Sequence, residues 1–401
     1  MNLIREFIAD EVATPLTKGK ATFARFRPGR VQLDSHGKIV RVETFSRSKL
    51  RLASKKSLYR ARCLVPGLVD AHTHLLFAGD RAEEWNQRLK GATYEQIAAK
   101  GGGIKSSVKQ TRGATLSEIV RLGKQRLQRA SEFGITTLEI KTGYGLNLES
   151  ELKLLKAIDI LRDHTKIELI ATFMGAHAVP SEFKSRGSYV DYLIREVLPK
   201  VRKRAEFQDV FCERGYFTKE DTIRLLAQGR KMGLKAKVHA HEFGRTGGVE
   251  AAAEVRACSA DHLMHVSDSD LKRLRQAKVV PVVLPGTSLF LNTGTFAPAK
   301  KMLAAGLPVA IASDFNPGTN PTQNLLLCGT FAAIFQRLSL EEVLRGQTLF
   351  AAWALDRYDR GALEKGKRGD LADFDVGRFE EIYYRYGSVS AVSSFSRGQF
   401  I

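Results

Sequence analysis

The sequence predicts an α/β protein whose larger part is a TIM (β/α)8 barrel. Short runs of β-branched and apolar residues alternate with longer segments of helical period, which is typical of strand–helix units around a parallel sheet. Eight such runs occur between residues 64 and 314, the number that this barrel requires. Roughly 250 residues are typical of the fold, and residues 65–363 accommodate it.

The predicted strands, in chain order, are residues 64–72, 136–143, 167–177, 209–217, 234–241, 259–264, 279–286 and 308–314. The helices predicted between them include residues 116–133, 148–163, 219–232 and 271–278. Another helix is expected to begin after Ser339, since Glu342 has the spacing of a capping box, and to continue through LRGQTLFAAWAL.

Both ends of the chain differ from this pattern. GRVQLDSHGKIVRVETF near the start and DLADFDVGRFEEIYYRYGSVSAVSSFSRGQFI at the end are short β-patterned runs separated by turn residues. We therefore expect residues 1–64 and 364–401 to pair as one small β-sandwich domain beside a barrel domain of residues 65–363.

Composition excludes several classes of protein. A hydrophobic content of 43% in 401 residues is ordinary for a globular protein. The four cysteines form no C-x-x-C pair, which argues against a disulfide framework and against a zinc–thiolate site. The N-terminus MNLIREFIAD has no signal-peptide core, and no run reaches membrane-spanning length, so we expect a cytoplasmic protein with no membrane association.

The formal charge of +20 is high, but lysine and arginine are spread along the whole chain. No RNP-like or helix-turn-helix signature accompanies them, so we expect no nucleic-acid partner and a solvated basic surface that attracts anions. The glycine-rich AKGGGIKSS lacks the Lys-Ser/Thr of a P-loop and predicts a flexible turn over the barrel mouth.

Histidines recur where the predicted strands end. His72 and His74 are two residues apart, so on a strand they share a face. An isolated pair of this kind is as often an ordinary polar loop feature. However, the C-terminal ends of predicted strands, where TIM-barrel active sites lie, also carry His177, His239, His241 and His262.

Asp314 ends the eighth strand and can complete a metal site with these histidines. Without the histidines, an aspartate at this position before NPG would be interpreted as an ordinary turn or helix N-cap residue. Imidazoles with one carboxylate suit zinc or iron rather than magnesium or calcium. Such a metal activates water and polarises carbonyl groups, which indicates hydrolysis of an amide-like bond or deamination of a ring.

Several motifs resemble the metal-dependent amidohydrolases: PGLVDAHTH, histidines after the fifth and sixth strands, and SD after the eighth. Within them, HTHLLFAGDRAEEW, KTGYG, GAH, LPGTSLFL and ASDFNPGTNPT look like the imidazolonepropionase family. The resemblance covers about residues 64–355. It implies a TIM barrel of the amidohydrolase type that opens 4-imidazolone-5-propanoate to N-formimidoyl-L-glutamate in histidine degradation, by a metal-activated water attacking the ring carbonyl.

The resemblance also implies roles for individual residues. The metal, one divalent or trivalent zinc or iron ion per chain, would be held by His72, His74, His239 and Asp314. Substrate-binding residues would be Arg81, Tyr144, His177, Glu242, Asn316, Gly318 and Thr319, with Arg81 suited to the propionate carboxylate. Glu242, His262 and Asp314 would be catalytic, and a homodimer is the family's expected assembly.

Two points stay open in the sequence. The first is how Glu242 and His262 divide the proton transfers between them, since Glu242 could equally fix a metal ligand or the substrate's tautomer. The other is His241, which strand alternation places on the face of His239, as an extra ligand or a neighbour of the site. The alternatives for the whole chain are a related cyclic amidohydrolase or nucleobase deaminase, or a metal-free scaffold protein.

Overall fold

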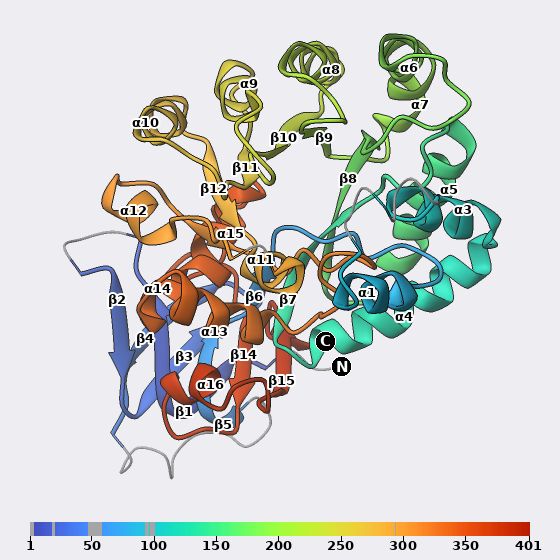
Figure 1. Cartoon of the computed structure of the whole chain (residues 1–401). Helices are drawn as coiled ribbons and strands as arrows, with labels where there is room; N and C mark the ends of the chain where they lie inside the picture. Colours follow the sequence, from blue (N-terminus) through green and yellow to red (C-terminus); the bar gives the residue numbers. More distant parts are fainter. Residues whose placement is uncertain (1–3, 18–20, 47–57, 93–95, 97–100, 293) are drawn as a thin grey trace.

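The computed structural model describes residues 4–17, 21–46, 58–92, 96, 101–292 and 294–401. Eight parallel strands form one sheet in strict chain order, with helices packed around the outside (Figure 1). These strands are β6 (Leu68–Asp70), β7 (Ile135–Lys141), β8 (Glu168–Ala176), β9 (Phe207–Cys212), β10 (Lys235–Ala240), β11 (Ser259–His262), β12 (Val280–Val283) and β13 (Ala310–Ile311).

The sheet closes where its first and last strands end. A parallel bridge joins Thr73 to Phe315, the Asp314 amide donates to the His72 carbonyl, and the His74 amide donates to the Phe315 carbonyl. The TIM barrel predicted from the sequence is confirmed, and an additional sheet is present where the sequence predicted a small β-sandwich of both chain ends. Closure by the very residues after β6 and β13 fixes His72, His74 and Asp314 side by side.

The helices of the barrel and its surroundings are α1 (Ala82–Leu89), α3 (Ile104–Gly113), α4 (Leu116–Ser131), α5 (Leu148–Arg162), α6 (Arg186–Tyr192), α7 (Leu198–Val201), α8 (Lys219–Lys231), α9 (Gly248–Glu254), α10 (Asp268–Ala277), α11 (Pro285–Leu291), α12 (Ala299–Ala304), α13 (Leu325–Phe335), α14 (Leu340–Arg345), α15 (Ala351–Ala354) and α16 (Glu380–Tyr384). Two π-helical segments, η2 (Leu193–Val197) and η3 (Gly346–Phe350), interrupt them.

Local signals place the helix starts. The predicted capping box at Ser339 and Glu342 is present, and the helix continues through η3 and α15. The prediction for α10 began too late, because a capping box between Ser267 and Asp270 starts the helix at Asp268. No helix in the described part of the chain is long and apolar enough to cross a membrane.

Both chain ends contribute to a second sheet, in the order β16-β15-β14-β5-β1-β3-β4 with β2 paired to β1. Its strands are β1 (Glu6–Pro15), β2 (Phe23–Phe26), β3 (Gly29–Leu33), β4 (Ile39–Thr44), β5 (Leu58–Pro66), β14 (Leu371–Phe374), β15 (Ala391–Ser396) and β16 (Gln399–Phe400). The division into domains of residues 1–64 plus 364–401 and 65–363 stays a prediction.

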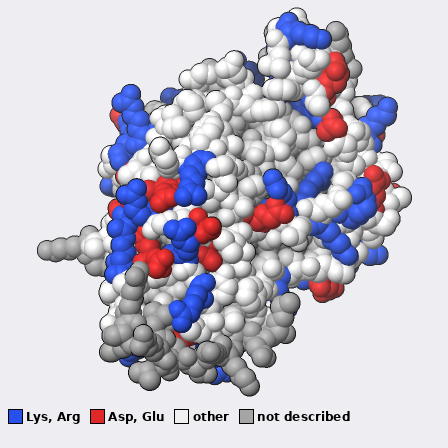
Figure 2. All heavy atoms as spheres, turned by 90° about the horizontal axis from the view of Figure 1, so that it is seen from below, with Lys and Arg blue, Asp and Glu red and all other residues white. Residues whose placement is uncertain are grey.

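Acidic and basic side chains are interspersed on the face seen from below (Figure 2). Several arginines there and elsewhere are paired, for example Arg357 with Glu206 at 2.7 Å and Arg360 with Glu168 at 2.8 Å. Such pairs reduce the field of a strongly basic chain at its surface.

Candidate active site

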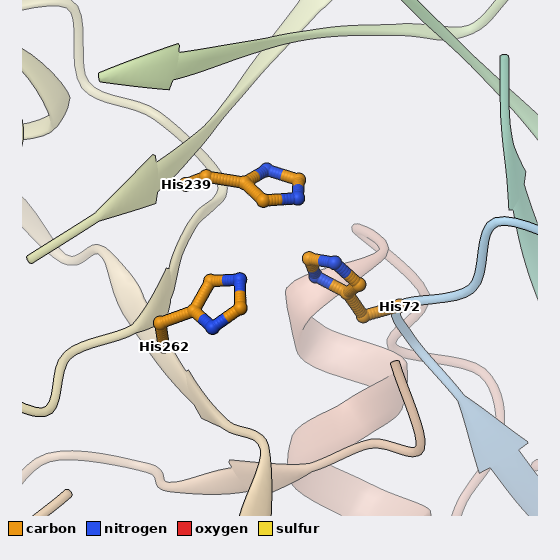
Figure 3. Close-up of side chains that lie close together, drawn as sticks. All are labelled: His72, His239 and His262. Atoms are coloured by element: carbon orange, nitrogen blue, oxygen red, sulfur yellow. The ribbon is translucent and has the colours of Figure 1, made fainter. Parts of the chain in front are cut away.

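Histidine and aspartate side chains gather at the carboxyl ends of the barrel strands. His72 and His74 follow β6, His239 lies in β10, His262 ends β11 and Asp314 follows β13, and all five are buried. Figure 3 shows the rings of His72, His239 and His262 facing one another. The structure thus brings together the residues that strand placement predicts to meet.

Distances within this group fit a metal ion. Asp314 Oδ1 lies 3.4 Å from His72 Nε2 and 3.7 Å from His74 Nε2, and the Nε2 atoms of His74 and His239 are 3.4 Å apart. In each of two triads, His72–His239–His262 and His72–His74–Asp314, the candidate ligand atoms lie within 4.8 Å of one another. Among the described residues, none is a hydrogen-bond partner of the buried His72 Nε2, which fits a metal-ligand atom.

The protonation state of the cluster also suits a metal. Burial, followed by the positive charge of neighbouring groups, lowers the pKa of His72, His74 and His262 well below its usual value. Neutral imidazoles carry the lone pair that coordinates a metal. These three imidazoles are therefore in the form that binds a metal.

A cavity opens beside the cluster and is lined by residues from several strand ends. Its walls include His74, His239, His262 and Asp314 together with predicted substrate-binding residues. Those residues are Arg81, Tyr144, His177, Glu242, Asn316 and Thr319. One small-molecule cavity therefore contains both the metal-ligating and the substrate-binding candidates.

Two of these residues form a polar wall next to the cluster. The His177 ring stacks on His74 with centroids 5.0 Å apart, and its Nδ1 lies 3.0 Å from the Gly143 carbonyl. Tyr144 is buried with its ring 5.3 Å from that of His177. Burial lowers the pKa of His177 to about 3, so this ring is neutral and can donate or accept a hydrogen bond.

The loop after β13 is organised by Asn316. Its Oδ1 accepts hydrogen bonds from the amides of Gly318 and Thr319 at 2.8 and 2.7 Å, and its Nδ2 donates to the Asp314 carbonyl at 2.7 Å. Gly318 lies against Arg81, and a Cβ at this position would overlap the guanidinium. The loop thus contributes Asn316 and Thr319 to the cavity wall.

Glu242 and His262 lie on the remaining side, with Glu242 Oε2 3.6 Å from His262 Nε2. Burial, then the charges of Asp314 and Glu213, raises the pKa of Glu242 well above its usual value. Glu242 therefore holds a proton more readily than an ordinary glutamate. Its backbone amide donates to Glu213 Oε1 at 2.6 Å, which fixes the turn that carries it.

Comparisons with known proteins agree with this geometry. Residues 110–382 match the Amidohydrolase family. The imidazolonepropionase of Alkaliphilus oremlandii is 45% identical over 330 residues, covering 81% of this chain and 78% of the relative. That of Geobacillus kaustophilus is 41% identical over 404 residues, covering 98% and 95%. The chain belongs to the imidazolonepropionase family, within the amidohydrolases.

Among solved structures, 5-methylcytosine deaminase from Klebsiella pneumoniae liganded with 5-fluorocytosine superposes with a TM-score of 0.76. Its identity to this imidazolonepropionase-family chain is 16%, over 99% of this chain and 97% of the deaminase. At this identity the likeness shows a shared fold.

This imidazolonepropionase-family site rests on carboxylates that the sequence analysis did not single out. Asp261 Oδ2 lies 2.6 Å from His72 Nδ1, and Asp209 Oδ2 lies 3.0 Å from His239 Nδ1. Each carboxylate orients its imidazole so that Nε2 faces the centre of the site. The signal available in the sequence was a charged residue inside an otherwise apolar strand.

Two buried lysines neutralise these carboxylates in part. Lys141 Nζ lies 2.7 Å from Asp209 and 2.9 Å from Glu139, and Lys237 Nζ lies 3.2 Å from Glu139. Both lysines are also within 4 Å of Asp261, at 3.7 and 3.8 Å. Three carboxylates thus face two ammonium groups beside the site. The excess negative charge favours the binding of a cation there.

The structure places His241 outside the group of candidate metal ligands. Strand β10 ends at Ala240, and His241 has a φ of +58°, so strand alternation no longer applies. The ring lies 3.9 Å from Glu250 of α9, outside both metal triads. His262 and Asp314 also have positive φ values, +77° and +54°, which shows how sharply the chain turns at these strand ends.

Proposed function

We propose that this protein hydrolyses 4-imidazolone-5-propanoate to N-formimidoyl-L-glutamate, the reaction of histidine degradation for which its relatives are named. The observation that carries the proposal is a single cavity that holds both a histidine–aspartate cluster and a buried arginine, Arg81. A cyclic amide with a carboxylate side chain matches both features.

We further propose that His72, His74, His239 and Asp314 hold one zinc or iron ion. When bound there, the metal would polarise the ring carbonyl and make water a nucleophile near neutral pH. Imidazole ligands supported by Asp209 and Asp261 favour this borderline metal class over magnesium or calcium.

The remaining residues bind the substrate and move protons. Arg81 binds the propionate carboxylate, while Tyr144 and His177 hydrogen-bond the ring edge. Asn316, Gly318 and Thr319 form the loop that contacts the opened product. This arrangement holds the ring carbonyl towards the histidine cluster and the side chain towards α1.

His262 has a lowered pKa and is therefore a free base that can orient and deprotonate the attacking water. Glu242 has a raised pKa and therefore delivers a proton to the ring nitrogen as the ring opens. Two groups whose environments shift their pKa values apart in this way are suited to opposite roles.

The test compares substrates on the purified protein. Imidazolonepropionate, generated in place from urocanate, should be consumed, whereas cytosine and guanine should release no ammonia. Ammonia release from a nucleobase with imidazolonepropionate left intact would replace this proposal with the deaminase alternative, in which Arg81 has no carboxylate to bind.

A further inference from the structure

Arg81 is paired with the carboxylate of Glu84 in the first turn of α1. Glu84 Oε2 accepts from Arg81 Nε at 2.8 Å, and the two oxygens of Glu84 also accept from the Gly103 amide at 3.1 Å each. The side chain of Arg81 is 6% exposed and that of Glu84 16%. Glu84 thus bridges the arginine and the glycine-rich stretch.

The backbone of Gly103 makes this bridge possible. Its φ of 73° and ψ of −146° belong to a region that residues with a Cβ rarely adopt. Gly103 is the residue before α3, and the next residue, Ile104, lines the cavity. The triple glycine therefore directs an amide at Glu84 and leads the chain to the cavity wall.

The opposite side of Arg81 is closed by the loop after β13. Gly318 packs against the guanidinium with no space for a Cβ. Arg88, one α1 turn beyond Glu84, donates through Nη2 to the Gly318 carbonyl at 3.0 Å. Both walls that confine Arg81 are therefore tied to side chains of α1.

We propose that Glu84 and Gly103 form a bracket that sets the orientation of Arg81 and thereby the preference for substrates bearing a carboxylate side chain. This rests on the proposed function, since it assigns Arg81 to the propionate group. Glu84 is a positioning residue: it contacts Arg81 rather than the substrate. Because Glu84 fixes Nε, the guanidinium is already oriented when a planar carboxylate binds. Less conformational entropy of the arginine side chain is then lost on binding.

The kinetic test uses Glu84→Gln and Gly103→Ala, with Glu83→Gln as the matched control because Glu83 is the exposed neighbour on the same turn. Loss of one charge-assisted hydrogen bond should raise KM for imidazolonepropionate about tenfold in E84Q, with kcat changing less than about threefold. G103A should change KM in the same direction, and E83Q should match the native protein.

A second substrate separates positioning from general damage. The native preference for imidazolonepropionate over the imidazolone ring without its propionate chain should fall about tenfold in E84Q and stay in place in E83Q. An unchanged preference in E84Q, or a loss confined to kcat, would overturn the proposal.

Amide hydrogen exchange of residues 101–104 tests the bracket without catalysis. Exchange should be about tenfold faster in E84Q than in the native protein and unchanged in E83Q, since the neutral glutamine oxygen is a weaker acceptor for the Gly103 amide than the carboxylate. Equal exchange in E84Q and native protein would overturn the bracket. If the native protein consumes no imidazolonepropionate, the proposed function fails, and exchange still decides whether Glu84 holds this loop.

Discussion

Removal of the Asp261 carboxylate should weaken metal binding in a graded way. Asp261 Oδ2 lies 2.6 Å from His72 Nδ1, and its Oδ1 accepts from the Ser259 hydroxyl at 2.6 Å. In Asp261→Asn the amide oxygen can still accept from His72 while the NH2 group donates to Ser259, so orientation survives and one negative charge is lost. In Asp261→Ala both orientation and charge are lost.

The magnitude follows from the charges below the site. Three carboxylates face two ammonium groups there, those of Glu139, Asp209 and Asp261 and those of Lys141 and Lys237. D261N removes the one excess negative charge, so that two negative charges face two positive charges. Partners of metal-bound histidines contribute 10–100-fold in affinity, roughly 1.4–2.7 kcal/mol. We therefore expect about a tenfold loss for D261N and about a hundredfold loss for D261A.

The assay is competition for zinc against a chromophoric chelator, with bound metal measured after dialysis. Asp268→Asn is the matched control, since its side chain is 82% exposed and pairs with Lys301. Metal affinity of D261A within threefold of the native value would refute the reasoning that Asp261 supports a ligand.

Three further outcomes are expected. Glu242→Gln should lower kcat for imidazolonepropionate by about 10²–10⁴ with metal content unchanged, because the amide cannot deliver a proton; near-full turnover would exclude an essential proton role. Arg81→Lys should lower kcat/KM by about tenfold, since an ammonium keeps the charge but loses the fork, and equal kcat/KM would argue against carboxylate binding. Burial raises the pKa of Glu213 to about 7, so the folded state binds this proton more tightly than the unfolded state. The free energy of unfolding should therefore fall as the pH rises from about 4.5 to 7. In urea unfolding of Glu213→Gln, this fall should be smaller by about 2–3 kcal/mol, and a pH profile identical to that of the native protein would contradict the pKa assignment.

Much of the fold could be predicted because strand periods and helix caps are local signals. The apolar runs ending at His72, His239, His262 and Asp314 predicted both the strands and their common edge. Parallel strands buried on both faces make such runs conspicuous, as in β7, where every residue is buried.

The support beneath the site was missed for a physical reason. Glu139 and Lys141, like Lys237 and His239, are two residues apart on a strand and share a face that points to the same interior as the histidines. Their pairing across strands depends on barrel register, which a single sequence does not contain. His241 was misplaced because the end of β10 depends on a positive φ that histidine rarely adopts.

The most direct test of the central claim is turnover of imidazolonepropionate measured together with metal content on the same sample, with His72→Ala as the control. The account predicts turnover that disappears on chelation, returns with zinc or iron at about one ion per chain, and is absent in H72A. Turnover that persists in a metal-free sample, or a metal-loaded protein that leaves imidazolonepropionate intact, would contradict it.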